Sequence, residues 1–129
     1  MENKEIVVNA MNQLFHEKDS AAIERYWQES YIQHNPSMTS GHQGLRNLLP
    51  LLDSTFKWEP GIIVQDGNIV VTHSLVHGWG LAPVIVVDIF RMEDGKIAEH
   101  WDVVQLEVPA SESANGNAMN SFNMIRNGK

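Results

Sequence analysis

The sequence predicts an α+β fold in which helices come first and cover one face of an antiparallel sheet. Up to residue 54 the apolar side chains recur at helical spacing, whereas from residue 56 onward they alternate with a period of two. Asp-Gly pairs at 66–67 and 94–95 are typical of tight hairpin turns. With 129 residues, 43% of them hydrophobic, the chain is long enough for one domain. We place that domain at residues 1–108 and expect an irregular tail over 109–129.

Three helices are expected in the first half of the chain. Residues 2–18 carry a single apolar stripe, which indicates an amphipathic helix. Cap-type residues at 19–20 start a second helix that runs to about residue 28. Residues 31–36 leave the helix before Pro36 and are expected to form a strand end or a loop. A third helix is expected over 43–54, with a kink or a break at Pro50.

Four strands are expected in the second half, over residues 58–65, 68–77, 84–92 and 96–107. Short turns between neighbours indicate an antiparallel meander, and a longer glycine-containing loop over 78–83 joins the middle pair. Because the helices precede these strands instead of alternating with them, we expect the helices to gather on one face of the sheet.

Composition and charge exclude several classes of function. Nine basic against sixteen acidic residues give a net charge of −7, which disfavours nucleic acid and anionic membranes as partners. The absence of cysteine excludes disulfides, thiolate catalysis and cysteine-bound zinc. No apolar run is long enough to span a bilayer, and the acidic N-terminus does not have the form of a secretory signal. We therefore expect a cytoplasmic protein with small-molecule or protein partners.

The last two strands carry the titratable residues that indicate chemistry. A three-residue turn between them would pair Met92 with Lys96 and place Asp88 opposite His100. Asp102 then follows two residues further on the same face. A two-residue turn would instead pair Asp88 with Trp101 and scatter the polar side chains. We favour the first register, and with it a cluster of two acids and one imidazole on one face.

This face is otherwise apolar, which predicts that the cluster is buried and used. Burying three titratable groups costs several kcal/mol unless each one is hydrogen-bonded. The alternative is a face that lies in solvent. We expect the cluster to face a pocket between sheet and helices, with walls that include Tyr31, Trp79, Val86 and Phe90.

Two further histidines are candidates for the same pocket. His73 alternates with apolar residues in its strand, and His34 leaves a helix among aromatic residues. Either one can equally be a structural histidine. Together with His100 and Asp88 they are possible metal ligands, but no short ligand spacing supports this. We therefore expect no metal and, since no glycine set fits a nucleotide-binding motif, no cofactor. The absence of a Gly-x-Ser-x-Gly motif argues against acyl transfer.

The opposite face of the same hairpin is apolar as well. An antiparallel sheet covered on one side only is expected to have a polar outer face. Two apolar faces imply two coverings, so we expect a second subunit on the outer face and a homodimer. The residues expected at that interface are Ile89, Ile97, Trp101 and Val103.

The segment Tyr-Ile-Gln-His-Asn-Pro at 31–36 and the hairpin at 88–103 resemble the SnoaL-like polyketide cyclase family of the nuclear transport factor 2-like superfamily. The resemblance implies a cone-shaped, strongly curved mixed sheet, wrapped around a pocket and closed by helices, in a protein that is usually dimeric. It also implies that Asp102 matches the general acid/base of the family. Asp88 falls where cyclase members can carry a histidine, and this departure matters because an ionised carboxylate cannot donate to an oxyanion.

The function expected from these observations is cofactor-independent acid–base chemistry on a small apolar carbonyl compound, of the aldol-cyclase, isomerase or lyase type. Asp102 is the expected base, and His100, His34 and His73 are the expected orienting or oxyanion donors. Asp88 would pair with one of these histidines and fix its tautomer. The alternatives are a non-catalytic ligand-binding or sensor module of the same fold, a metal-dependent activity and a role in assembly.

Overall fold

The computed structural model describes residues 1–121, and its centre is a five-stranded mixed sheet in the order β1-β5-β4-β3-β2. Strand β1 pairs with β5 in parallel, whereas the other neighbours are antiparallel. The helices are α1 (Asn3–Met11), α2 (Ala22–Tyr26) and α3 (Gly41–Leu48), and the strands are β1 (Trp27–Gln33), β2 (Lys57–Asp66), β3 (Ile69–His77), β4 (Val84–Glu93) and β5 (Lys96–Leu106). The expected α+β class with helices before the meander is confirmed.

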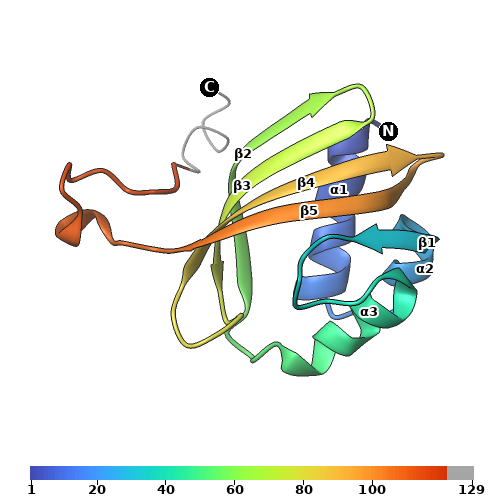
Figure 1. The fold of residues 1–129 in the computed structure, drawn as a ribbon, viewed down its shortest axis with the longest axis horizontal. Helices are drawn as coiled ribbons and strands as arrows, with labels where there is room; N and C mark the ends of the chain where they lie inside the picture. Colours follow the sequence, from blue (N-terminus) through green and yellow to red (C-terminus); the bar gives the residue numbers. More distant parts are fainter. Residues whose placement is uncertain (122–129) are drawn as a thin grey trace.

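The apolar stripe of the first helix explains how the sheet is covered. Val7 and Ala10 of α1, and Leu14 of the π-helical turn that continues it, are fully buried, and they share one core cluster with side chains of all the strands. Figure 1 shows α1 against the curved sheet, with α3 and β1 grouped at one end. Within residues 1–121, no helix is both long and apolar enough to cross a membrane.

The second helix is shorter than the sequence predicts. It ends at Tyr26, and Trp27 is already extended and begins β1, so the expectation of helix to residue 28 is wrong. Trp27 pairs with Ile97 of β5, which replaces the helical hydrogen bonds of this segment by sheet contacts. Near Pro50 the outcome is a break: α3 ends at Leu48, and a separate turn of 3-10 helix, η2 (Leu49–Leu51), follows.

The register of the last hairpin also differs from the prediction. Glu93 pairs with Lys96, so the turn has two residues, and Asp88 lies opposite Asp102 instead of His100. The extra residue is Ala98, which forms a bulge inside β5. The bulge shifts the side-chain alternation of β5 by one residue. Beyond it, His100 and Asp102 therefore still lie on the same inner face as Asp88.

The bulge corrects one residue of the expected outer face. Ile97 lies before the bulge, is fully buried and belongs to the helix-covered core, so it is not available to a second subunit. Its partner Met92 is buried on the same side. The outer face therefore begins at Glu99 and continues through Trp101 and Val103.

Part of the tail lies against the edge of the sheet. Between β5 and residue 121 the chain forms a short 3-10 turn, η3 (Ala110–Glu112), and the Asn120 side chain donates to the carbonyl oxygen of Glu59 at 2.9 Å. Asn120 is buried by this contact. Residues 122–129 of the expected tail lie outside the described residues.

His16 connects the helical layer to the start of β2. It ends a π-helical turn, η1 (Asn12–His16), and its Nε2 accepts a hydrogen bond from the backbone N–H of Trp58 at 3.0 Å. Its Nδ1 lies 3.0 Å from Asn12 Oδ1 and donates to it. Both contacts require a neutral ring, and burial, followed by the positive charge of Lys57, lowers the pKa of His16.

We expect this histidine to make the fold less stable in mild acid. Because its pKa is lower in the folded than in the unfolded chain, its contribution is complete above about pH 6.5 and is lost as the pH falls toward the folded pKa. His16→Gln keeps an acceptor near the position of Nε2 but does not titrate. Between pH 7.5 and about pH 5 the variant should therefore lose less unfolding free energy than the wild type does. Urea denaturation at several pH values measures the unfolding free energy of both proteins. The same decrease with falling pH in both would contradict this prediction.

Candidate active site

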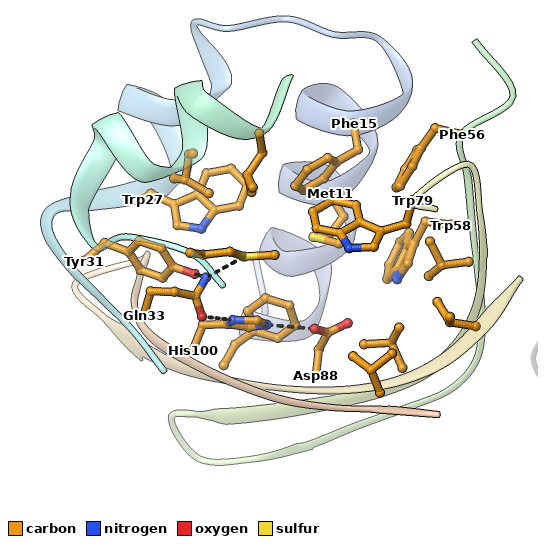
Figure 2. Close-up of a pocket in the computed structure, with 18 residues that line it drawn as sticks. Met11, Phe15, Trp27, Tyr31, Gln33, Phe56, Trp58, Trp79, Asp88 and His100 are labelled. Atoms are coloured by element: carbon orange, nitrogen blue, oxygen red, sulfur yellow. Dashed lines mark hydrogen bonds and ion pairs between the residues drawn. The ribbon is translucent and has the colours of Figure 1, made fainter. Parts of the chain in front are cut away.

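A cavity of about 90 Å³ lies between the inner face of the sheet and the helices. Its walls are mostly aromatic and aliphatic, and Asp88, His100 and Gln33 are the polar exceptions that share a hydrogen-bond network (Figure 2). A cavity that is apolar apart from a few converging polar groups is typical of a small-molecule site. The four residues expected in the pocket walls all border it: Tyr31, Trp79, Val86 and Phe90.

Asp88 of β4 and His100 of β5 form a buried pair at this cavity. His100 Nε2 lies 2.7 Å from Asp88 Oδ1, and each side chain is more than nine-tenths buried. On its other side, His100 Nδ1 lies 2.7 Å from Gln33 Oε1. The structure thus brings Asp88 together with one of the three candidate histidines.

The surroundings of Gln33 determine where the protons of this pair lie. The backbone N–H of Asn35 donates to Gln33 Oε1 at 3.0 Å, and Gln33 Nε2 donates to the Tyr31 hydroxyl at 3.0 Å. Gln33 Oε1 is therefore an acceptor, and His100 Nδ1 must carry a proton. One further proton is held between His100 Nε2 and Asp88, which gives either an imidazolium–carboxylate pair or a neutral pair.

Tyr31 stands beside this network as a neutral phenol. Burial, and then the negative charges of Asp88 and Asp102, raise the pKa of Tyr31 far above its ordinary value. Its oxygen accepts from Gln33, so its own O–H is oriented by the network and is available as a donor. Tyr31 can therefore donate a hydrogen bond, but it cannot serve as a base near neutral pH.

Asp102 lies next to the pair but is held in a different way. Both of its carboxylate oxygens accept from Asn35 Nδ2 at 2.9 Å, and the residue does not border the cavity. Asp88, His100 and Asp102 each place a potential ligand atom within 4.8 Å of the others, and within residues 1–121 this is the group that could hold a metal ion. Each of the three side chains also hydrogen-bonds to another of them or to Gln33 or Asn35.

The other two candidate histidines lie outside the cavity. His34 Nε2 is 2.6 Å from Glu99 Oε2, and its ring stacks on Trp101 with centroids 4.9 Å apart. The hydrogen bond from His34, followed by that from Arg91, lowers the pKa of Glu99. These contacts lie on the outer face of the sheet and do not reach the cavity.

His73 lies on the outer face as well. In β3 the inward residues are Val70, Thr72, Ser74 and Val76, and His73 alternates with them. Its register partner in β4 is Val87, which does not border the cavity either. The expectation that His34 and His73 act as donors beside His100 therefore does not fit their positions.

Sequence analysis did not single out Gln33, Asn35 or Trp58. Gln33 pairs with His100 across the parallel β1–β5 contact, and Asn35 follows it toward Asp102. Both Gln33 and Asn35 belong to the segment 31–36 that the sequence marks as leaving the helix, but the strand that pairs with this segment cannot be deduced from alternation alone. Trp58 borders the cavity from β2, and its aromatic side chain at a strand start looked like ordinary core.

The sequence model of the SnoaL-like domain matches residues 8–100. No curated protein matches the chain. Among solved structures, an uncharacterized cystatin-fold protein from Novosphingobium aromaticivorans superposes with a TM-score of 0.69 at 19% identity, covering 80% of this chain and 98% of that one. A nuclear transport factor 2-like protein of unknown function from Cytophaga hutchinsonii gives 0.69 at 16% identity, with coverages of 81% and 91%. IdmH from Streptomyces antibioticus, a candidate polyketide cyclase, gives 0.64 at 14%, with coverages of 81% and 93%.

Proposed function

Because this chain belongs to the SnoaL-like family of the nuclear transport factor 2-like superfamily, we propose that its cavity binds a small apolar carbonyl compound and performs cofactor-independent acid–base chemistry on it. The observation that carries this proposal is the buried Asp88–His100 pair at the wall of an otherwise apolar cavity. A few polar groups that converge on a mostly apolar cavity are typical of binding and catalytic sites.

The reaction we propose begins with removal of a proton from the carbon next to the ligand carbonyl. One oxygen of Asp88 is hydrogen-bonded to His100, and the other, which has no hydrogen-bond partner within residues 1–121, can accept that proton. The electron pair left on carbon moves to the carbonyl oxygen, and the enolate is stabilised by the imidazolium of His100 and by hydrogen-bond donors of the wall. Aldol closure, double-bond isomerisation and β-elimination all start from this intermediate.

This proposal places the base at Asp88, whereas the family pattern points to Asp102. Asp88 borders the cavity, while both oxygens of Asp102 are occupied by Asn35. In this arrangement Asp102 is a second acidic group near His100. Separate substitution of the two acids distinguishes the assignments, as argued in the Discussion.

Deuterium exchange tests the activity without knowledge of the natural substrate. Acetophenone is a one-ring ketone with an exchangeable methyl group beside its carbonyl. In D₂O the wild-type protein should accelerate incorporation of deuterium at that methyl, detected as a mass increase and loss of the methyl proton signal. Acetophenone that binds but exchanges at the rate of buffer alone would support the alternative, a non-catalytic ligand-binding or sensor module.

We also propose that two copies associate through the outer face of the sheet. Two rows of mainly apolar neighbours cross this face, and among residues 1–121 no helix covers them. Val64 is 53% exposed and Val103 is 67% exposed at opposite ends of the rows. An exposed apolar surface of this extent is typical of an interface. The rows are Val64–Val71–Ile89–Trp101 and Ile62–His73–Val87–Val103.

Replacement of Trp101 by Glu should separate this dimer. It removes an aromatic residue from the centre of the patch and adds a negative charge to a chain whose net charge is already −7. Light scattering should give twice the chain mass for the wild type and one chain mass for Trp101→Glu. Trp79→Glu, a partly exposed tryptophan at the cavity, is the control and should stay dimeric. A wild-type monomer would refute the proposed interface.

A cytoplasmic location stays a prediction from the sequence.

A further inference from the structure

We infer that the indole N–H of Trp58 is the donor that orients the ligand, and that the ligand carries a neutral carbonyl oxygen directed at it. This inference rests on the proposed function, because it specifies the ligand of the same cavity. It assigns a specificity-determining role to a residue of β2, two strands away from the Asp88 side chain in β4.

The indole N–H of Trp58 is a buried hydrogen-bond donor without a partner in the described part of the chain. The residue is only 3% exposed, and its Nε1 has no hydrogen-bond partner within residues 1–121. Buried indole N–H groups are normally paired, and an unpaired one costs stability. Four other buried polar atoms in this part of the chain also have no partner, but Trp58 alone among the five residues borders the cavity.

The position of Trp58 is fixed by contacts that do not involve its indole nitrogen. Its backbone N–H donates to His16, and its register partner in β3 is Val76. Figure 2 shows the Trp58 ring at the side of the cavity opposite Tyr31, with Asp88 between them on the floor. The Trp58 ring and the Asp88–His100 pair therefore lie at different sides of one bound ligand.

These positions define the chemical class of the ligand. The aromatic walls favour a flat molecule. The donor requires an acceptor atom on that molecule. A carboxylate is disfavoured because Asp88 and Asp102 already place negative charge at the site, so a ketone or aldehyde oxygen fits best.

The experiment compares acetophenone with α-methylstyrene, in which a CH₂ group replaces the carbonyl oxygen at nearly the same shape. Relative to the wild type, Trp58→Phe should lower the ratio of ketone affinity to hydrocarbon affinity about tenfold, because it removes the hydrogen bond and keeps the apolar contacts with both probes. Trp79→Phe removes a different cavity indole, one that is 38% exposed, and should keep the wild-type ratio. In ¹⁵N-labelled wild type, the Trp58 indole resonance should shift downfield with acetophenone and not with α-methylstyrene.

Each other outcome contradicts the inference. A ratio of ketone to hydrocarbon affinity that is the same in Trp58→Phe as in the wild type, or an unmoved Trp58 resonance while acetophenone binds, would remove Trp58 from this role. Failure of both probes to bind at millimolar concentration would refute the ligand class. None of these readouts needs turnover, so a shifted Trp58 resonance without deuterium exchange would retain the inference while refuting the proposed catalysis.

Discussion

Replacement of Asp88 by Asn is expected to lower the rate of deuterium exchange by about 10²–10⁴-fold, the range typical for loss of a general base. Asparagine has nearly the same shape but cannot accept the proton, and its amide can still occupy the place beside His100. Binding of acetophenone should change little, because the carbonyl contact lies on another strand. Exchange rates at saturating ligand, together with the dissociation constant, separate these two effects.

Asp102→Asn is the matched control for this substitution. It changes a carboxylate of the same cluster that does not border the cavity, so the expected loss is much smaller, about tenfold or less through the altered charge near His100. If Asp102→Asn were the inactive variant and Asp88→Asn stayed active, the base would be Asp102, as the family pattern implies. Unchanged exchange in both variants would remove the cluster from catalysis.

The alternation of residues in the last two strands was sufficient to predict which acids converge, although the predicted register was wrong. Side-chain alternation assigns a residue to a face, and this assignment survives a shift of two residues. The pairing of Asp88 with Asp102 depends on the bulge at Ala98, and nothing in the local sequence marks that residue as a bulge. Ile97 was assigned to the outer face for the same reason. It lies between the turn and the bulge, and there the alternation places it on the inner face.

The partners that the first half of the chain supplies, Gln33 for His100 and Asn35 for Asp102, were beyond prediction because they come from a parallel contact between distant segments. Gln33 and Asn35 follow the second helix, and more than sixty residues separate them from His100 and Asp102. Alternation shows that a strand exists but not which strand lies beside it. His34 and His73 were predicted from residue type and flanking apolar residues, and that pattern is equally typical of a histidine on an outer sheet face.

The largest expected loss of stability follows from Trp27→Ala, at about 3–5 kcal/mol. Trp27 is 2% exposed, stands where α2 gives way to β1, and borders the cavity that the helices close. Its carbonyl oxygen accepts from His42 Nε2 at 2.8 Å, which ties this point to α3. Removal of the indole leaves a void between the helices and β5. These elements are held in place by their other packing contacts, so they cannot move together to fill it.

Urea denaturation measures this loss as a lower midpoint with an unchanged slope. Trp79→Ala is the control, since the same side chain is removed from a position that is 38% exposed, and about 1 kcal/mol is expected there. A loss of similar size in both variants would mean that Trp27 does not anchor the junction of helix and sheet. A void at Trp27 would also widen the cavity, so Trp27→Ala should bind ligands larger than acetophenone, such as two-ring ketones, more tightly than the wild type does.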